Sequence, residues 1–287
     1  MDNPRHTAQF IFKEFRQSLY ALYDRHETES ITEIIFEHEL QLSKIDLAVR
    51  KDLILEESNR KKIEADLELL LSGTPVQYVV GNTQFCGLTL KVTKDVLIPR
   101  QETEELVQWI VKENTLPSPK ILDVCTGSGC IALALKNEIK NAEVTALDIS
   151  KEALEIANKN ASENHLSIQF FQKNILVDAL DENIEYDILV SNPPYVKNSE
   201  KNLMHINVLN HEPHIALFVE DENPLIFYER IIFLANNILK SLGCLYFEIN
   251  ENHADEIKIL LLKNGYKEIV IKKDLNGKLR MIRAIKP

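Results

Sequence analysis

The chain has 287 residues, of which 45% are hydrophobic and 27% are charged, with only 8 Gly and 10 Pro. This length and composition predict one large folded domain or two smaller ones, and they exclude a disordered or fibrous chain. The formal net charge of -11 argues against broad, nonspecific affinity for nucleic-acid phosphates, which requires a basic surface.

The N-terminal residues 1–6 are polar, and no secretory apolar run follows them. No apolar segment approaches the roughly 18 residues of a membrane helix. The four cysteines form no CxxC pair, and a chain of this length rarely depends on a disulfide framework. We therefore expect a cytoplasmic protein with no membrane segment.

Residues 7–71 are predicted to be helical throughout, because apolar residues recur there at helical spacing. Ser43 and Ser58 are candidate caps of a third and a fourth helix, and Gly73 begins a stop signal. A small helical domain over residues 1–74 is the expectation. Its role is left open between a purely structural bundle and a module that docks a partner.

Residues 75–100 change to alternating polar and apolar residues broken by Gly81 and Gly87. This pattern predicts a β-hairpin that begins at residue 75 and links the two domains. Gln101 opens the next helix, with Thr103 near its cap.

Residues 101–287 form the second predicted domain, in which strands and helices alternate. Strands are expected over residues 120–124, 142–147, 168–171, 186–190 and 244–249, and helices over residues 131–135, 151–161, 225–242 and 257–262. Asn276-Gly277 predicts a terminal hairpin. The alternation predicts an α/β fold with a parallel sheet and right-handed crossovers, to which the hairpin adds an antiparallel strand.

A glycine-rich turn joins the first of these strands to its helix, with the sequence Cys125-Thr126-Gly127-Ser128-Gly129. The glycines permit positive φ and let the backbone approach a ligand closely, and the following helix N-terminus attracts a carboxylate. The spacing matches neither the dinucleotide fingerprint nor the phosphate loop, so nicotinamide and ATP cofactors are disfavoured. Tight packing alone is the simpler explanation of such a turn.

Asp148 ends the next strand, about 20 residues after the glycines. An acidic residue at that place can accept hydrogen bonds from both ribose hydroxyls, although it can also cap the helix that follows. With the glycine turn before it, we favour ribose binding.

The strongest chemical signal is Asn192-Pro193-Pro194-Tyr195, which follows a buried strand. Two prolines give a stiff turn with free carbonyls, Asn192 adds an amide, and Tyr195 adds a flat apolar surface. The turn lies beyond the carboxyl end of a strand, where α/β sheets bind ligands. Such a site suits a planar group that carries NH2. Together with the glycine turn and Asp148, it points to S-adenosylmethionine beside an amine-accepting pocket.

These motifs resemble the release factor glutamine methyltransferases of the PrmC/HemK family. The resemblance covers nearly the whole chain, and its matching segments are residues 75–81, 96–104, 126–132, 192–195, 211–217 and 247–250. The Asn-Pro-Pro-Tyr tetrapeptide is shared with adenine N6-methyltransferases. The segment Ile98-Pro99-Arg100-Gln101-Glu102-Thr103-Glu104, together with a helical domain, is more specific.

The resemblance implies a seven-stranded Rossmann-like class I methyltransferase sheet and S-adenosylmethionine as methyl donor. It implies that residues 125–129 contact the cofactor, that Asp148 holds its ribose, and that bacterial peptide chain release factors are the partners. The substrate is then the glutamine of their Gly-Gly-Gln motif. A monomer without metal, and without a direct nucleic-acid substrate, is expected.

Two positions depart from the family pattern. Cys125 stands where glycine is more common, which adds a Cβ near the cofactor. Asn174-Ile175 stands where Asp and an aromatic residue are frequent. Asn174 can still hydrogen-bond an adenine amine, whereas Ile175 stacks less well than a ring.

For the chemistry, we expect the Asn192 side-chain oxygen and the Pro193 carbonyl to accept hydrogen bonds from both N–H groups of the substrate amide. These bonds orient the amide nitrogen towards the methyl group. Tyr195 packs on the amide plane, and Pro194 stiffens the turn. Arg100 and Glu104 either line the substrate groove or pair with each other at the start of a helix. The alternatives are an adenine N6-methyltransferase acting on DNA or RNA and a non-catalytic module that binds a translation factor.

Overall fold

The computed structural model describes residues 6–50 and 52–287, so most of the polar N-terminal stretch noted above lies outside the described residues. The chain divides into two compact units. One contains the residues up to Gly81 together with His205–His211, and the other contains Asn82–Met204 and Glu212–Pro287. The first unit therefore includes a short segment from the second half of the sequence.

The helical unit is built from α1 (Ala8–Leu19), α2 (Arg25–Leu40), α3 (Lys44–Val49), α4 (Glu57–Leu71) and α5 (Val76–Val80). Ser43 caps α3 as predicted, because its side chain accepts a hydrogen bond from the backbone N–H of Asp46. The cap predicted at Ser58 is wrong, since Ser58 lies within α4, which begins at Glu57 after the cap residue Glu56. Residues 76–80 form a helix rather than the predicted strand, and Gly81 ends it at φ +74°.

The segment from the second half of the sequence contributes α9 (Ile206–His211) to this unit. Asn207 Nδ2 donates a hydrogen bond to Tyr23 Oη at 3.3 Å, and Tyr23 Oη donates to the Leu70 carbonyl at 3.2 Å. Gly73 lies beside α9, and a Cβ at Gly73 would come within 3.2 Å of Asn207 Oδ1. The helical unit is thus completed by a part of the chain that follows the Asn-Pro-Pro-Tyr turn.

The second unit contains a seven-stranded sheet with the order β10-β11-β9-β6-β3-β4-β5. The strands are β3 (Lys120–Val124), β4 (Glu143–Asp148), β5 (Gln169–Gln172), β6 (Tyr186–Ser191), β9 (Leu239–Glu248), β10 (Lys267–Lys273) and β11 (Leu279–Ile285). All neighbouring pairs from β9 to β5 are parallel, whereas β11 is antiparallel to both of its neighbours. The predicted α/β fold with an antiparallel terminal hairpin is confirmed.

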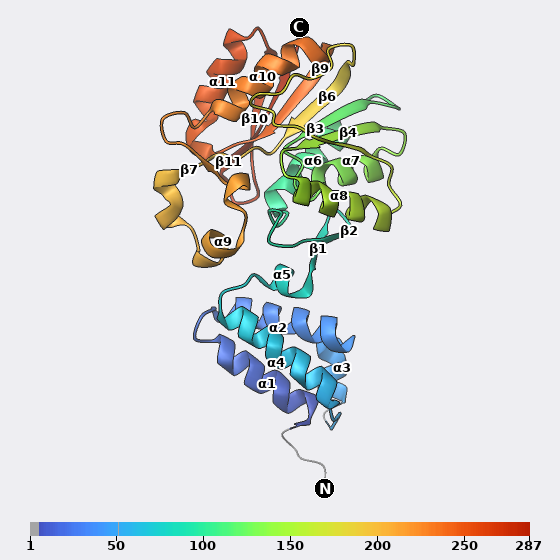
Figure 1. Ribbon diagram of the computed structural model, residues 1–287, viewed down its shortest axis with the longest axis vertical. Coiled ribbons are helices and arrows are strands. Elements are labelled where there is room, and N and C mark those ends of the chain that lie inside the picture. The colour runs from blue at the N-terminus through green and yellow to red at the C-terminus, as the bar shows by residue number, and fades with distance from the viewer. Residues whose placement is uncertain (1–5, 51) are drawn as a thin grey trace. The chain divides into compact units, whose positions relative to one another are not determined.

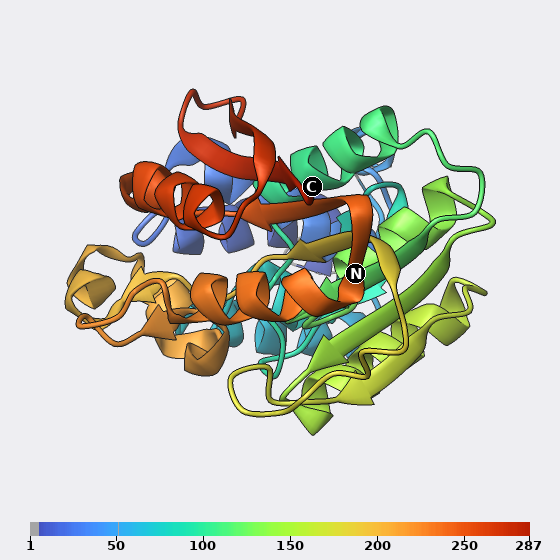
Figure 2. The same ribbon diagram turned by 90° about the horizontal axis from the view of Figure 1, so that it is seen from above.

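Helices cover both faces of this sheet (Figures 1 and 2). On one face, α10 (Ile226–Ile238) and α11 (Ala254–Lys263) pack on alternate strand residues such as Leu122 and Leu189. On the other face, α6 (Gln101–Glu113) and α7 (Cys130–Glu138) pack on the intervening residues such as Ile121. The predicted helix over residues 225–242 was too long, because the apolar run continues into β9 at Leu239.

The hairpin of β1 (Asn82–Phe85) and β2 (Leu88–Lys91) packs against α8 (Lys151–Glu163). A buried side chain of α8, Asn160, accepts from Lys91 N at 2.6 Å and donates to Lys91 O at 3.1 Å. It also donates to Ser128 O at 2.9 Å. One amide therefore ties the hairpin to the glycine-rich turn.

The register of strand pairing places the carboxyl ends of β3, β4 and β6 next to one another. Val124 of β3 pairs with Leu147 of β4 and with Ser191 of β6, so the residues that follow these strands share one edge of the sheet. The glycine-rich turn, Asp148 and Asn192 consequently meet there. Among the described residues, no helix is long and apolar enough to cross a membrane.

Candidate active site

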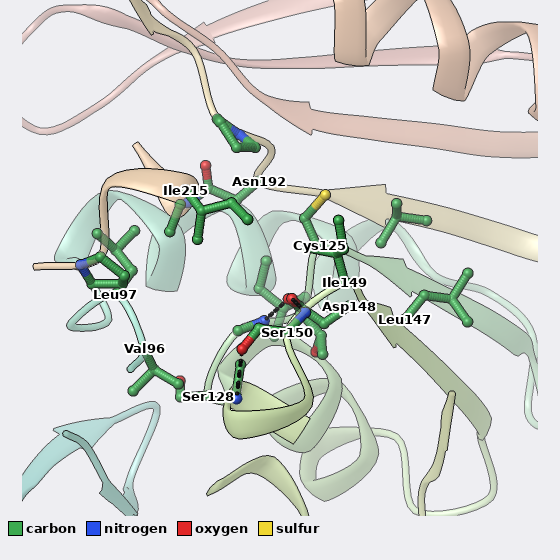
Figure 3. Close-up of a pocket in the computed structure, with 18 of the residues that line it drawn as sticks. Val96, Leu97, Cys125, Ser128, Leu147, Asp148, Ile149, Ser150, Asn192 and Ile215 are labelled. Atoms are coloured by element: carbon green, nitrogen blue, oxygen red, sulfur yellow. Dashed lines mark hydrogen bonds between the residues drawn. The ribbon is translucent and has the colours of Figure 1, made fainter. Parts of the chain in front are cut away.

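A cavity of about 270 Å³ opens at this edge of the sheet, and we call it the large cavity. Its lining includes most of the predicted site residues: Arg100, Cys125, Thr126, Gly127, Ser128, Asp148, Asn174, Ile175, Asn192 and Pro194. In the view of Figure 3, Asn192 and Ile215 lie above, Asp148 and Ser150 lie below, and Cys125 lies between Asn192 and Asp148. The structure thus gathers residues that are far apart in the sequence around one space.

A second, much smaller hollow of about 30 Å³ adjoins the Asn-Pro-Pro-Tyr turn, and we call it the small hollow. Pro193 and Tyr195 line this hollow rather than the large cavity. Leu97, Asn192 and Ala216 line both. Asn192 is therefore placed at the junction of the two spaces.

The two glycines of the turn have different surroundings. Gly127, at φ +55°, has no atom within 4 Å of a Cβ built on its backbone, and it faces the large cavity. At Gly129, φ +83°, such a Cβ would come within 3.2 Å of side chains of Leu133 and Ala157. Gly129 therefore permits helix packing and does not line the cavity, whereas Gly127 leaves room for a ligand.

Asp148 holds the turn through backbone donors. One carboxylate oxygen accepts from Gly127 N at 2.8 Å, and the other accepts from Ser150 N at 2.9 Å. Ser150, not Asp148, caps α8, because its hydroxyl accepts from Ala153 N at 3.0 Å. Burial raises the pKa of Asp148, while the backbone hydrogen bonds oppose that rise. Each carboxylate oxygen keeps a second lone pair for a ligand.

Asp123 is a buried residue of the site that the sequence interpretation missed. Its Oδ2 accepts from the Thr126 hydroxyl at 2.5 Å and from Ala132 N at 3.2 Å, so it fixes both ends of the glycine-rich turn. Burial raises the pKa of Asp123 to about 7. The residue precedes the turn by two positions in the chain, and its charge in an otherwise apolar strand was the available signal.

Cys125 adopts φ +63°, a left-handed conformation that favours glycine. Cys125, which stands where glycine is more common in the family, therefore occupies a position where a Cβ costs about 1 kcal/mol. Burial raises the pKa of the Cys125 thiol, so the group stays protonated. It adds an apolar contact to the wall of the large cavity.

Asn174 and Ile175 contribute the far wall of the large cavity. The Asn174 side-chain oxygen accepts from Leu176 N at 3.1 Å, which makes a tight local turn. Ile175 is buried in the core beneath the cavity. The pair presents one amide edge and one apolar surface to the space.

The acceptor end of the site contains a chain of side-chain hydrogen bonds, which we call the Asn192 network. Asn192 Nδ2 donates to Thr103 Oγ1 at 3.3 Å, and Thr103 Oγ1 donates to Glu248 Oε2 at 2.6 Å. The Tyr195 hydroxyl donates to Glu248 Oε1 at 3.1 Å. Burial raises the pKa of Tyr195, so its phenol stays neutral. Thr103 was expected only near a helix cap and Glu248 was not expected in the site at all.

Arg100 and Glu104 do not pair with each other. Arg100 lines the large cavity and its guanidinium donates to the buried Glu212 carboxylate, which also accepts from Ile98 N at 3.3 Å. Glu104 accepts from Cys86 N at 2.6 Å and is not part of either lining, because its side chain faces the hairpin. Glu212 thus anchors the loop after the turn, while Glu104 anchors the hairpin.

His211 and His214 flank Glu212 and Pro213 in the chain. His214 packs edge-on against Phe218, with ring centroids 5.1 Å apart. Within residues 6–50 and 52–287, no group of three or more His, Cys, Asp or Glu side chains is arranged to hold a metal ion.

Two family patterns match the chain. The family described as "Methyltransferase small domain" matches residues 101–217, and the one described as "PrmC N-terminal domain" matches residues 2–81. The release factor glutamine methyltransferase of Flavobacterium psychrophilum is 48% identical over 275 residues, which cover 94% of this chain and 96% of that protein. The protein of the same name from Bacteroides thetaiotaomicron is 41% identical over 269 residues, with the same coverage.

Solved structures resemble the chain in fold. The hMettl16 catalytic domain aligns with a TM-score of 0.56 at 16% identity, covering 80% of this chain and 82% of that one. A methyltransferase from Pyrococcus furiosus aligns with a TM-score of 0.51 at 16% identity, covering 80% and 99%. Identities this low support the fold and nothing further.

The sheet order, the cavity at the carboxyl ends of its strands and the matched domain define a Rossmann-like class I methyltransferase. Within that class, the chain belongs to the release factor glutamine methyltransferase family, because relatives of that name match it over nearly its whole length. The predicted family and enzyme class are confirmed. The adenine N6-methyltransferase and the non-catalytic binding module are not favoured.

Proposed function

We propose that this protein transfers a methyl group from S-adenosylmethionine to the side-chain amide nitrogen of the glutamine in the Gly-Gly-Gln motif of bacterial peptide chain release factors. The observation that carries the proposal is the position of Asn192. It lines both the large cavity and the small hollow, where a methyl donor and an amide acceptor would have to meet.

The large cavity has the features that the donor requires. Gly127 leaves open space beside its backbone, and Asp148 keeps lone pairs for ribose hydroxyls. Leu147 and Ile175 offer apolar surface to a base, and the Asn174 amide can hydrogen-bond its edge. When bound, S-adenosylmethionine supplies an electrophilic methyl group on a positively charged sulfur. Residues 125–128 would hold the rest of the molecule against the turn.

The chain's own residues then orient the acceptor. Asn192 Oδ1 and the Pro193 carbonyl accept hydrogen bonds from the two N–H groups of the glutamine amide, which fixes its nitrogen in line with the methyl carbon. Both oxygens also stabilise positive charge that develops on that nitrogen. Tyr195 packs against the amide plane, and Pro194 keeps the turn rigid. The N–C bond forms as the C–S bond breaks, and the amide proton leaves to water.

The helical unit is the candidate for recognising the release factor, because none of its described residues lines the large cavity or the small hollow. Its α9 follows the Asn-Pro-Pro-Tyr turn in the chain after residues 196–205. Arg100, at the cavity wall, is a further candidate contact with substrate. Glu104 is a second candidate, outside that wall, where it binds Cys86 N. The protein acts in the cytoplasm, as a monomer.

The test is methyl transfer from labelled S-adenosylmethionine to a purified release factor, with the modified residue mapped by mass spectrometry. Label on the Gly-Gly-Gln glutamine is expected, and a release factor with that glutamine replaced by alanine is the control. Double-stranded DNA and RNA are assayed in parallel. Label on nucleic acid, or on a different residue of the release factor, would overturn the proposal.

A further inference from the structure

A primary amide such as that of Asn192 is useful only when it faces the right way. Its oxygen accepts hydrogen bonds and its nitrogen donates them, and the two ends differ little in shape. A half-turn of the side-chain amide would present two N–H donors to a substrate that itself carries two N–H donors. Something at this site must fix that rotation.

The Asn192 network contains a group that can do so. Thr103 has a single hydroxyl proton. Thr103 Oγ1 lies 2.6 Å from Glu248 Oε2. An ionised carboxylate can only accept, so with Glu248 ionised the Thr103 proton must be donated to it. Thr103 Oγ1 therefore has only lone pairs left to offer Asn192, 3.3 Å away. The nitrogen of Asn192 must face Thr103, and its oxygen must face away.

We propose that Thr103 and Glu248 are positioning residues that fix the rotation of the Asn192 side-chain amide, so that Asn192 Oδ1 faces the methyl acceptor. The inference rests on the proposed function for its substrate, but the rotation itself is a property of the protein alone. Neither residue touches the acceptor. They act through Asn192.

Two hydroxyl donors and a nearby positive charge stabilise the ionised form of Glu248 against the effect of its burial. Glu248 is 2% exposed, and each of its two carboxylate oxygens accepts from one hydroxyl, those of Thr103 and Tyr195. Burial raises the pKa of Glu248, while these hydrogen bonds and the nearby Arg280 charge oppose the rise. Arg280 also lies 3.6 Å from Asp274, which holds the guanidinium in place. A protonated Glu248 would free the Thr103 proton and leave the rotation of Asn192 undetermined.

The test is a double-mutant cycle with Thr103→Val, Thr103→Ser and Asn192→Ala. Because a small misplacement can cost roughly a hundredfold, Thr103→Val should lower kcat by roughly 10- to 100-fold, with the Kd for S-adenosylhomocysteine within about threefold of wild type. Thr103→Ser keeps the hydroxyl and should stay within about threefold in kcat. In the Asn192→Ala background, Thr103→Val should cost less than about twofold more.

Thr32→Val is the matched control. Thr32 is equally buried, but its hydroxyl donates only to the Thr28 carbonyl within α2 of the helical unit. It should lower stability without changing kcat. A kcat for Thr103→Val near wild type, a Thr103→Ser variant as impaired as Thr103→Val, or a full additional loss in the Asn192→Ala background would each overturn the proposal.

A second measurement needs neither substrate nor variant. In ¹⁵N-labelled wild-type protein, the Asn192 side-chain amide should show one proton that exchanges slowly with solvent, because it is bonded to Thr103. Fast exchange of both protons would contradict the fixed rotation. If the wild-type enzyme failed to label release factor glutamine, the proposed function would fall while this measurement still decided the orientation.

Discussion

The two ends of the site are held in different ways. At the cofactor end, the carboxylates of Asp123 and Asp148 and the amide of Asn160 bond mostly to backbone groups of the glycine-rich turn and its neighbours. At the acceptor end, Asn192, Thr103, Glu248 and Tyr195 bond to one another through side chains. A turn fixed through its backbone tolerates changes in its own side chains. A side-chain network depends on the identity of every member.

The largest effect is expected at the acceptor end. Asn192→Ala removes one of the two carbonyl oxygens that bind the acceptor amide. Loss of such a preorganised group should lower kcat by about 1000-fold, equivalent to about 4 kcal/mol. Cofactor affinity should change by less than about threefold. Single-turnover methyl transfer and calorimetric titration with S-adenosylhomocysteine measure the two effects separately, and turnover near the wild-type rate would contradict the assignment.

At the cofactor end, Asn160→Ala should act on stability instead. The substitution leaves Lys91 N, Lys91 O and Ser128 O without their side-chain partner, and unsatisfied buried groups cost about 1 to 3 kcal/mol each. Because part of this backbone is near solvent, we expect a loss of about 3 kcal/mol in urea unfolding. The control is Asn158→Ala on the same helix, where only a bond to Leu154 O is lost. Equal losses in the two variants would show that Asn160 does not anchor the turn.

Asp123 makes the cofactor end sensitive to pH. Its folded-state pKa of about 7 lies above the ordinary value of 3.8, so the folded protein keeps a proton that the unfolded chain releases. Stability from this group is therefore full below pH 4 and falls as the pH rises towards 7. Asp123→Asn cannot ionise, so wild type should lose about 2 kcal/mol relative to the variant between pH 5 and pH 7. Parallel unfolding curves with a pH-independent difference would refute this.

Asp148→Ala should weaken binding more than turnover. The change removes the predicted ribose acceptor and also frees Gly127 N and Ser150 N, so the turn loosens. We expect S-adenosylhomocysteine to bind roughly tenfold more weakly, about 1.4 kcal/mol, with kcat at saturating cofactor reduced much less. Asp181→Ala, in an exposed loop, is the control. A fall in kcat with unchanged affinity for S-adenosylhomocysteine would mean that Asp148 serves the acceptor end of the site.

The sequence predicted the succession of strands and helices in the second domain, the glycine-rich turn and the Asn-Pro-Pro-Tyr turn, because these depend on local sequence pattern. It did not predict that Thr103 and Glu248 meet, since they are 145 positions apart and neither belongs to a motif with its own chemistry. The separate environments of Gly127 and Gly129 were also invisible, because packing against α8 decides them. The helix at residues 76–80 was mistaken for a strand because its valines favour strands locally, whereas packing within the helical unit selects the helix.

The smallest effect is expected for Cys125→Gly, which tests whether the backbone alone builds the cofactor end. Glycine relieves about 1 kcal/mol of strain at φ +63°, but it loses a core contact and adds about 0.5 to 1 kcal/mol of unfolded-state entropy. The net change in unfolding free energy should therefore stay below about 1 kcal/mol. Cofactor affinity should also change little, because the hydrogen bonds of the turn come from Asp123 and Asp148 and not from Cys125. A loss of more than about tenfold in affinity would mean that the thiol itself contacts the cofactor and that this end, too, depends on a side chain.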